Sequence, residues 1–583
     1  MSAPESTDAH WRALADVLRP HRRQYVALAV ALGASSALLL VGPLLVGRTV
    51  DRAAEGASVA ELTALAGALV GIGVAAQVAS VIVTWWATRI AWSTTNELRI
   101  ELVGHVLGLD HEFHRTHTPG ELVQRIDGDV TALSDLLARV VPKVGGAVLT
   151  TMGMVVVLTV IDLRIGAAML LYVAVAVWVT GRRRNRAVDE SADEMSAYAR
   201  LYGGIEERLT AAEDLRSNGG TAYALGGFVD ESVDCVSTAL DRERSYLSVW
   251  RALHLAIASG GILAVVGGAW LLENGVIALG TVFVLFQYTQ LLRRPLEDVM
   301  DQLQLIQKAS GGMRRVLDLR AERPTILDEG TTSPPSGALE VEFDDVDFDY
   351  GDGLPVLHDV SLRLGAGRSL GLVGRTGSGK TTMARLVLRL LETSSGEVRL
   401  GGVGIGAVPL TELRSRVAMV PQEVQLVAGS VRDNVTLFEP TVPDETVAAV
   451  LRRVGLDRLV AGGLDRELGA AGAGLSAGES QLLALARVWL REPDLVVLDE
   501  ATARVDPATE ARLAHAVDDL LRGRTAVVIA HRLSTLERVD DIAVVDAGRV
   551  VEHGERTVLE ADPTSRYGSL LRAGRQAQEE VLA

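Results

Sequence analysis

Long apolar runs alternate with polar stretches over the first half of the chain. Several of these runs exceed about 20 residues with almost no charge, which is the length needed to cross a bilayer as a helix. Helices buried inside a soluble protein are the alternative, and they do not require uncharged runs of this length. The pattern therefore predicts six membrane spans, at 25–47, 62–86, 142–161, 165–181, 250–272 and 276–292.

The connections at 87–141 and 182–249 are polar and have a helical pattern, so we expect helices that extend well past the membrane surface. Arginines cluster before the first span and directly after the fourth, whereas the loops on the other side are short and poor in bases. Because basic residues favour the cytoplasmic side, this asymmetry predicts that the N-terminus and both long connections are cytoplasmic.

The pattern changes after a segment rich in Pro, Gly, Ser and Thr. Residues 321–337 have linker composition, and beyond them short β-branched runs alternate with glycine turns and amphipathic helices. We therefore predict a multidomain protein. An all-α six-helix transmembrane domain (1–320) is followed by a linker (321–337) and an α/β domain (338–583).

Composition supports a membrane protein and argues against a nucleic-acid partner. Hydrophobic residues make up 48% of the 583 residues, and the mean hydropathy is +0.24. The net charge of −17 does not suit a polyanion-binding protein. Cys235 is the sole cysteine, so an intrachain disulfide is excluded, and we expect it to be a packing residue.

A strand-like run, SLGLV at 369–373, leads into GRTGSGKTT at 374–382 and then into a helical pattern. This is the strand–loop–helix setting that the phosphate-binding motif G-x-x-x-x-G-K-[ST] needs. Its glycines let backbone N–H groups close around a β-phosphate at the start of the helix. We predict that Lys380 reaches the β- and γ-phosphates of ATP and that Thr381 supplies a hydroxyl to Mg²⁺. The predicted ATP-binding residues of this loop are Gly374, Arg375, Thr376, Gly377, Ser378, Gly379, Lys380, Thr381 and Thr382.

The run DLVVLDE at 494–500 is predicted to be an apolar strand that ends in two acids. Asp499 would hold Mg²⁺ and Glu500 would activate water as a general base, which suits ATP hydrolysis. Two carboxylates that merely cap a strand end are the structural alternative. A further strand, TAVVIAH, ends in His531, which we predict to be a catalytic residue near the γ-phosphate, although a histidine there can also be purely structural.

Six motifs follow one another in a fixed order: FDYGDGLPVLHDVSL, the phosphate loop, MVPQEVQLVAGSVRDNV, LSAGESQ, LDEATARVD and IAHRLST. Together they resemble the ATP-binding domain of ABC transporters over roughly 338–575. In the membrane half, 113–130 and 204–217 resemble the family's two cytoplasmic coupling segments, and 278–299 resembles its sixth span. The whole chain resembles an exporter-type half-transporter.

The resemblance implies roles for further residues. Tyr350 would stack on adenine. Gln422, a metal residue together with Thr381 and Asp499, would link the metal site to the membrane domain. Asp506 would lie in the loop that communicates between two paired ATP-binding domains. Each ATP site of the family is built from two chains, so a single such domain implies a dimer.

LSAGESQ departs from the family's usual LSGGQ at Ala477 and Glu479. By the resemblance, Ser476, Gly478 and Glu479 would face the γ-phosphate held by the opposite subunit. A unit charge about 8 Å from that phosphate would cost roughly 0.5–2 kcal/mol. However, S-x-x-E is also a capping box, in which the acid folds back onto the Ser476 N–H and is favoured at the helix start by about 0.3–1 kcal/mol. We therefore expect a functional signature that is also a helix cap.

Two further departures from the family pattern lie in loops that would face the opposite subunit. The usual acid is missing near Ala470, and Arg504 and Val505 replace the usual residues of the inter-domain loop. By contrast, the chain has every residue that the family uses to bind and hydrolyse ATP at the chain's own site. These residues are Lys380, Thr381, Gln422, Asp499, Glu500 and His531. This one-sided pattern favours a heterodimer with a second half-transporter over a homodimer.

We therefore predict an ATP-driven exporter of the plasma (inner) membrane, in contact with membrane lipid, that moves a small-molecule, lipid or peptide-like substrate. An importer built on the same fold, for example for siderophores, and a channel or regulatory receptor remain alternatives. The predicted membrane spans and the negative net charge argue against a soluble ABC ATPase that acts on DNA or ribosomes.

Glycines and glutamines within the predicted spans suggest where helices pack closely and where polar contacts form. The glycines of SGGILAVVGGAW at 259–270 predict close helix packing. Gln77, Gln287 and Gln290 either line a substrate path or make hydrogen bonds between helices.

Overall fold

The computed structural model describes residues 18–351, 353–469, 474–499, 507–530 and 533–573. The chain divides into two compact units. The first, here called the membrane unit, comprises 1–108 and 117–322. The second, the nucleotide unit, comprises 323–583 together with the short segment 109–116. The boundary between Glu322 and Arg323 falls at the start of the predicted linker.

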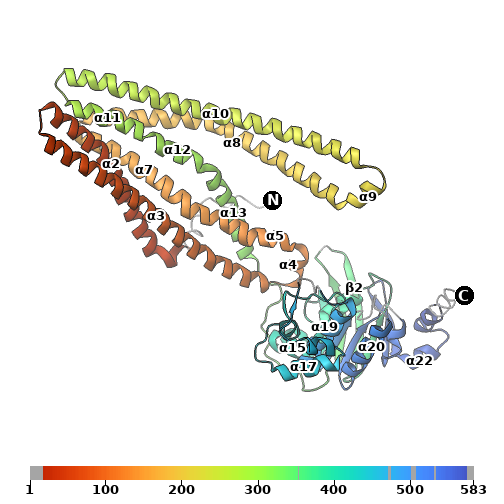
Figure 1. The fold of residues 1–583 in the computed structure, drawn as a ribbon. Helices are drawn as coiled ribbons and strands as arrows, with labels where there is room; N and C mark the ends of the chain where they lie inside the picture. The colour runs from red at the N-terminus through yellow and green to blue at the C-terminus, as the bar shows by residue number, and fades with distance from the viewer. Residues whose placement is uncertain (1–17, 352, 470–473, 500–506, 531–532, 574–583) are drawn as a thin grey trace. The chain divides into compact units, whose positions relative to one another are not determined.

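The membrane unit is helical throughout its described residues. Figure 1 shows α8 and α10 side by side as a long hairpin that is closed by the short helix α9. Helix α2 packs against α3, α7 and α11, which gathers the apolar segments into one bundle. The main helices are α2 (Arg22–Ala54), α3 (Val59–Leu107), α7 (Val141–Ile161), α8 (Leu163–Thr210), α9 (Ala212–Ser217), α10 (Thr221–Glu273) and α11 (Leu279–Leu291).

Three of these helices are far longer than a membrane is thick. They contain 49, 48 and 53 residues in α3, α8 and α10. At about 1.5 Å per residue each is roughly 70–80 Å long, against a hydrocarbon core of about 30 Å. The prediction of helices that extend beyond the membrane surface is confirmed.

Five helical segments among the described residues are long and apolar enough to span a membrane, and each contains one of the predicted spans. The sixth predicted span, 276–292, forms helix α11 from Leu279 onward. Leu292 has helical backbone angles, and hydrogen bonds from the Leu292 N–H to Tyr288 and from the Leu296 N–H to Leu292 lead on into α12 (Arg293–Asp301). The first residues of the predicted span therefore precede the helix, and its apolar part ends where the two arginines begin.

An ion pair between a half-exposed arginine and a buried aspartate joins two segments at the end of the membrane unit that leads into the linker. The Arg315 guanidinium, on α13 (Leu303–Ala321), donates to both carboxylate oxygens of Asp129 at 2.5 and 2.7 Å. Asp129 is only 3% exposed and ends a π-helical segment, Gln124–Asp129. Gly312 allows the close approach, because a Cβ there would lie 3.2 Å from Asp129.

The nucleotide unit is built on a six-stranded sheet in the order β12-β11-β3-β10-β9-β6. Strands β3, β10, β9 and β6 run parallel, and β3, β9 and β10 are buried along their whole length. A four-stranded sheet, β2-β1-β4-β5, packs beside it. The strands are β1 (Val341–Asp349), β2 (Pro355–Leu364), β3 (Ser369–Val373), β4 (Ser395–Leu400), β5 (Val403–Gly404), β6 (Val417–Val420), β9 (Leu495–Asp499), β10 (Thr525–Ile529), β11 (Asp541–Asp546) and β12 (Arg549–Glu555).

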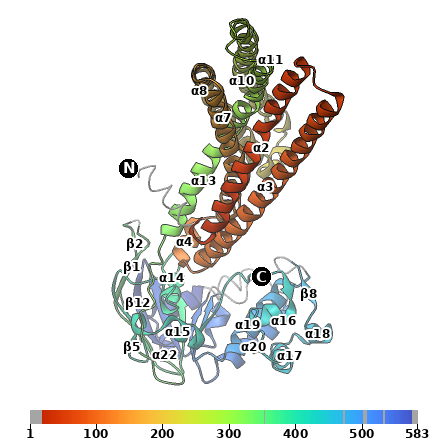
Figure 2. The same ribbon diagram turned by 90° about the vertical axis from the view of Figure 1, so that its left-hand side faces the viewer.

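A helical subdomain lies between β6 and β9 in sequence. Figure 2 shows its helices gathered at one end of the unit with the short strand β8 (Glu467–Leu468). A continuous apolar core joins α19 to the buried face of the six-stranded sheet. The helices are α16 (Val431–Thr436), α17 (Asp444–Arg453), α18 (Asp457–Ala461) and α19 (Ala477–Arg491). These helices lie within the long stretch of sequence that separates Lys380 from Asp499.

Candidate ATP-binding site

The loop after β3 has the backbone geometry of a phosphate cradle. Gly377 and Gly379 have φ of +82° and +104°, a left-handed conformation that favours glycine. Gly374 has no room for a side chain, because a Cβ would lie 2.1 Å from the Val545 carbonyl oxygen. Helix α14 (Lys380–Val387) begins directly after Gly379, so the loop presents its N–H groups at a helix start.

Two side chains of this loop are buried and directed into it. The Lys380 ammonium donates to the carbonyl oxygens of Gly374 and Arg375, both at 2.8 Å, so it bends back over the loop. The Ser378 hydroxyl is buried and has no hydrogen-bond partner among the described residues. A buried hydroxyl without a partner and an adjacent ammonium fit an oxyanion such as a phosphate.

Parallel strands bring the second motif to the same edge of the sheet. Ile529 on β10 is in register with Leu372 on one side and with Asp499 on the other. The phosphate loop and Asp499 therefore both follow strand ends at this edge. Asp499 is 6% exposed. Gln422 lies two residues beyond β6, whose Val420 pairs with Leu498, so it comes to the same edge.

Carboxylate, hydroxyl and amide oxygens are the ligands that Mg²⁺ prefers. Asp499, Thr381 and Gln422 supply one of each at this edge, so the residues present fit the predicted metal.

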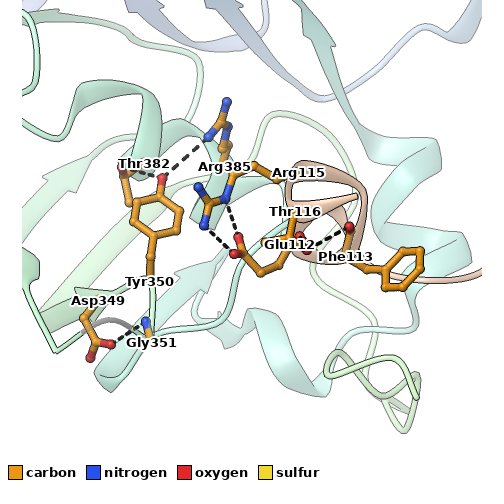
Figure 3. A network of polar contacts seen from close by, with 9 residues as sticks. All are labelled: Glu112, Phe113, Arg115, Thr116, Asp349, Tyr350, Gly351, Thr382 and Arg385. Carbon is orange, nitrogen blue, oxygen red and sulfur yellow. Dashed lines mark hydrogen bonds and ion pairs between the residues drawn. The ribbon is translucent and has the colours of Figure 1, made fainter. Parts of the chain in front are cut away.

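Tyr350 follows β1 and is held by contacts on several sides (Figure 3). Its hydroxyl lies 3.2 Å from the Thr382 hydroxyl and accepts a hydrogen bond of 3.5 Å from Arg385. The ring packs edge-on against Phe348, with the centroids 4.9 Å apart. The guanidinium of Arg115 lies over the ring, 5.1 Å from its centroid. Through Thr382 and Arg385, Tyr350 thus contacts α14, the helix that follows the phosphate loop.

Arg115 belongs to α4 (His111–Thr116), the short helix of the first predicted coupling segment. Its guanidinium also donates two hydrogen bonds to Glu112, at 2.5 and 2.8 Å, and this lowers the pKa of the Glu112 carboxyl. Burial, together with the nearby Arg385 charge, lowers the pKa of His111. Asp110 accepts hydrogen bonds from the N–H groups of Thr325 and Ile326. Residues 110–115 therefore contact the rest of the nucleotide unit at two points, through Asp110 and through Arg115.

The signature segment forms the predicted capping box. Ser476 is the N-cap of α19, and its hydroxyl accepts from the Glu479 N–H at 3.2 Å. The Glu479 carboxylate accepts from the Ser476 N–H at 2.9 Å. Its other oxygen pairs with Arg458, on α18, at 3.0 Å. The prediction of a cap is confirmed, and the charge of Glu479 is balanced by a cation that the sequence motif does not contain.

Several predicted residues lie outside the described part of the chain. They are the catalytic candidates Glu500 and His531, Asp506 of the inter-domain loop, and the departures at Ala470, Arg504 and Val505. The phosphate loop, Gln422 and Asp499 come to one edge of the sheet. Ser476, Gly478 and Glu479 stand at the start of α19, in the helical subdomain.

Sequence reasoning missed three arginines. Arg115 and Arg385 contact Tyr350, and Arg458 pairs with Glu479. Arg385 follows Lys380 by five residues on a helix, which is a weak signal that could have been read. Arg115 and Arg458 are brought to their partners only by the tertiary fold, so no local pattern marks them.

Comparison with known proteins agrees with this geometry. Residues 26–296 match the family described as "ABC transporter transmembrane region", and residues 357–503 match "ABC transporter". The ABC transporter ATP-binding protein YfiC of Bacillus subtilis is 29% identical over 533 residues, which cover 89% of this chain and 87% of YfiC. A fatty acid ABC transporter ATP-binding/permease protein of Mycobacterium bovis is 29% identical over 501 residues, 84% of this chain and 78% of the relative.

A solved structure has the same fold. It is described as a bacterial Atm1-family ABC exporter with ATP bound, and it superposes with a TM-score of 0.78 over 95% of this chain and 98% of that one, at 24% identity. At this identity the likeness shows the fold alone. The two family matches, in this order along one chain, show that the protein belongs to the ABC transporters: it is a multi-pass membrane protein of exporter fold, with an ATP-binding domain whose ATPase is coupled to transport.

Proposed function

We propose that the chain is one half of a dimeric ATP-driven exporter of the plasma (inner) membrane, with its N-terminus and ATP-binding domain in the cytoplasm. The observation that carries this proposal is the common sheet edge shared by the phosphate loop, Asp499 and Gln422. The polyphosphate of ATP would bind at this edge, where Mg²⁺ would be held by the side chains that fit it. Its transported substrate is a small molecule, a lipid or a peptide.

The chain's own residues divide the work at the site. The loop N–H groups and Lys380 hold the β- and γ-phosphates, and Asp499, Thr381 and Gln422 would hold Mg²⁺, which neutralises phosphate charge. Glu500 accepts a proton from the attacking water, and His531 orients the γ-phosphate. Tyr350 stacks on adenine. The contact between α4 and Tyr350 supports a direct link from the nucleotide to the coupling segment.

The second half of each site comes from the opposite subunit, through Ser476 and Gly478 at the start of α19. The pairing of Glu479 with Arg458 places a positive charge beside the carboxylate and so reduces its repulsion of the phosphate, which makes a functional signature compatible with this departure. The heterodimer proposal therefore depends chiefly on Ala470 and on Arg504 and Val505. A chain expressed alone that purifies as a dimer with full ATPase activity would exclude it.

ATP hydrolysis by the protein reconstituted in vesicles tests the site. Lys380→Met should reduce hydrolysis by at least about a hundredfold, because it removes the charge that stabilises the transferring phosphoryl group. Lys308→Met, at an exposed position on α13, is the matched control and should leave hydrolysis unchanged. Equal activity of the two variants would reject the proposed site. Uptake of substrate into inverted vesicles would support export, and its loss from them would favour an importer.

A further inference from the structure

A cavity of about 370 Å³ lies between α8, α10 and α11 in the membrane unit. This volume is within the range of small-molecule sites, about 300–1,000 Å³. Its walls are mainly apolar, and they include Ile165, Met169, Leu263, Leu271 and Leu285. Arg164 lines it at the end where α8 begins, and Tyr172 lies eight residues further along the same helix, about 12 Å away along the axis. The lining therefore extends about 12 Å along α8, with the cation of Arg164 near its start.

The hydroxyl groups in the walls are already engaged. Tyr172 donates to the Ala256 carbonyl oxygen at 2.9 Å, and Thr289 donates to that of Leu285 at 2.8 Å. The walls thus suit a hydrocarbon chain better than a polar ligand, because a polar group there would lose its hydrogen bonds to water without replacement.

Glycines contribute to the cavity in two different ways. A Cβ on Gly260 would lie 2.4 Å from the Tyr172 hydroxyl, and one on Gly268 would lie 2.8 Å from Val282, so these two glycines allow close packing, as the sequence predicted. Gly267 also lines the cavity, but nothing lies within 4 Å of the position of its Cβ. A side chain at Gly267 would enter open space without disturbing a neighbouring helix.

The Arg164 side chain makes no ion pair or hydrogen bond with any residue in the part of the chain that the structure describes; only its backbone N–H is bonded, to Asp162. Arg164 is exposed, at the second residue of α8, so its guanidinium is open to an incoming ligand at the end of the apolar lining. A guanidinium binds carboxylates with two parallel hydrogen bonds. The charge and the shape therefore select the same kind of ligand.

We propose that this cavity binds a long-chain carboxylate, with the acyl chain against the apolar walls and the carboxylate on Arg164. The inference rests on the proposed function only in treating this unit as a membrane-embedded transport domain. Binding at the cavity requires no ATP. A phospholipid of the bilayer and a helix of the partner subunit are the competing occupants that the experiment must separate.

The test uses the full-length protein, in its dimeric form, reconstituted in vesicles of phosphatidylcholine. The probes are hexadecanoate bearing a photoreactive diazirine and the matching hexadecanol, and labelled peptides are mapped by mass spectrometry. We expect the carboxylate to label peptides of α8, α10 and α11 about tenfold more than the alcohol. Arg164→Gln should reduce carboxylate labelling to the level of the alcohol.

Gly267→Leu narrows the cavity and should reduce labelling by both probes, and Gly267→Ala should reduce it less. Gly67→Leu on α3 is the matched control, because its Cβ position is equally open and it does not line this cavity. Equal labelling of Gly267→Leu and Gly67→Leu would overturn the proposal. Absent labelling of the native protein would also overturn it, in favour of a phospholipid or the partner subunit as occupant.

ATP hydrolysis measured on the same samples separates this inference from the proposed function. Hydrolysis without labelling would reject the carboxylate site and leave the exporter proposal intact. Labelling without hydrolysis would keep the site and count against the exporter proposal.

Discussion

Arg458 pairs with Glu479 at the start of α19. The variant Arg458→Gln leaves the Glu479 carboxylate, in the LSAGESQ segment (475–481), without its positive partner. The pair is joined at 3.0 Å, with Arg458 65% exposed and Glu479 17% exposed. An exposed pair of this kind contributes only about 0.2–1 kcal/mol to folding stability. The capping box between Ser476 and Glu479 remains in the variant, so we expect the fold to be retained.

The effect on the opposite nucleotide should be larger than the effect on stability. A carboxylate about 8 Å from the γ-phosphate costs roughly 0.5–2 kcal/mol once its counter-ion is gone, for effective dielectric constants of 80 to 20. Arg458→Gln should therefore weaken ATP binding by about 2- to 30-fold at the site formed by the start of α19 and the phosphate loop of the opposite subunit. The loss should shrink as salt is added, because the two charges are separated by about one Debye length.

The assay is a titration of the purified dimer with a fluorescent ATP analogue, in a Glu500→Gln background that prevents hydrolysis. The double variant Arg458→Gln, Glu479→Gln should regain native affinity, since glutamine still caps the helix. Arg491→Gln removes the same charge at the far end of α19, about 18 Å along the helix, and should have little effect. If Arg458→Gln and Arg491→Gln bind ATP equally, the electrostatic reasoning is refuted.

Two further predictions concern contacts outside the signature. Arg315→Gln leaves the Asp129 carboxylate buried without its partner; because Arg315 is itself half-exposed, we expect a loss of about 1–3 kcal/mol in stability, seen as a lower melting temperature. Arg320→Gln, which breaks a more exposed pair, is the control, and an equal shift for both would contradict the burial argument. Arg115→Ala frees a face of the Tyr350 ring from a contact of about 0.5–1 kcal/mol, so ATP affinity should rise about two- to fivefold; unchanged affinity would mean that the arginine does not compete with adenine.

Local chemistry explains why much of the nucleotide site was predictable. The phosphate loop needs glycine at left-handed positions between a strand and a helix, and Gly377 and Gly379 adopt such positions. The S-x-x-E spacing of Ser476 and Glu479 is set by one helical turn, so the cap also follows from sequence alone. Cys235 is buried, as expected for a packing residue.

Tertiary packing explains what the sequence could not predict. The pairing of Arg458 with Glu479 depends on how α18 packs beside α19, and the stacking of Arg115 on Tyr350 joins residues that are far apart in the chain. Neighbouring glycines of α10 also differ, because Gly268 faces Val282 while Gly267 faces open space, a distinction set by helix rotation. The start of the sixth span is predicted at 276 and lies at Leu279, because hydropathy alone does not locate the first residue of a helix.

ATP turnover by the Glu500→Gln variant, measured beside its ATP binding in the reconstituted protein, tests the central claim most directly. If Glu500 activates the attacking water at a site built on Lys380 and Asp499, hydrolysis should fall by at least about a hundredfold. ATP binding should be retained, because the glutamine leaves the phosphate loop and Asp499 intact. Turnover equal to that of the native protein would contradict the account.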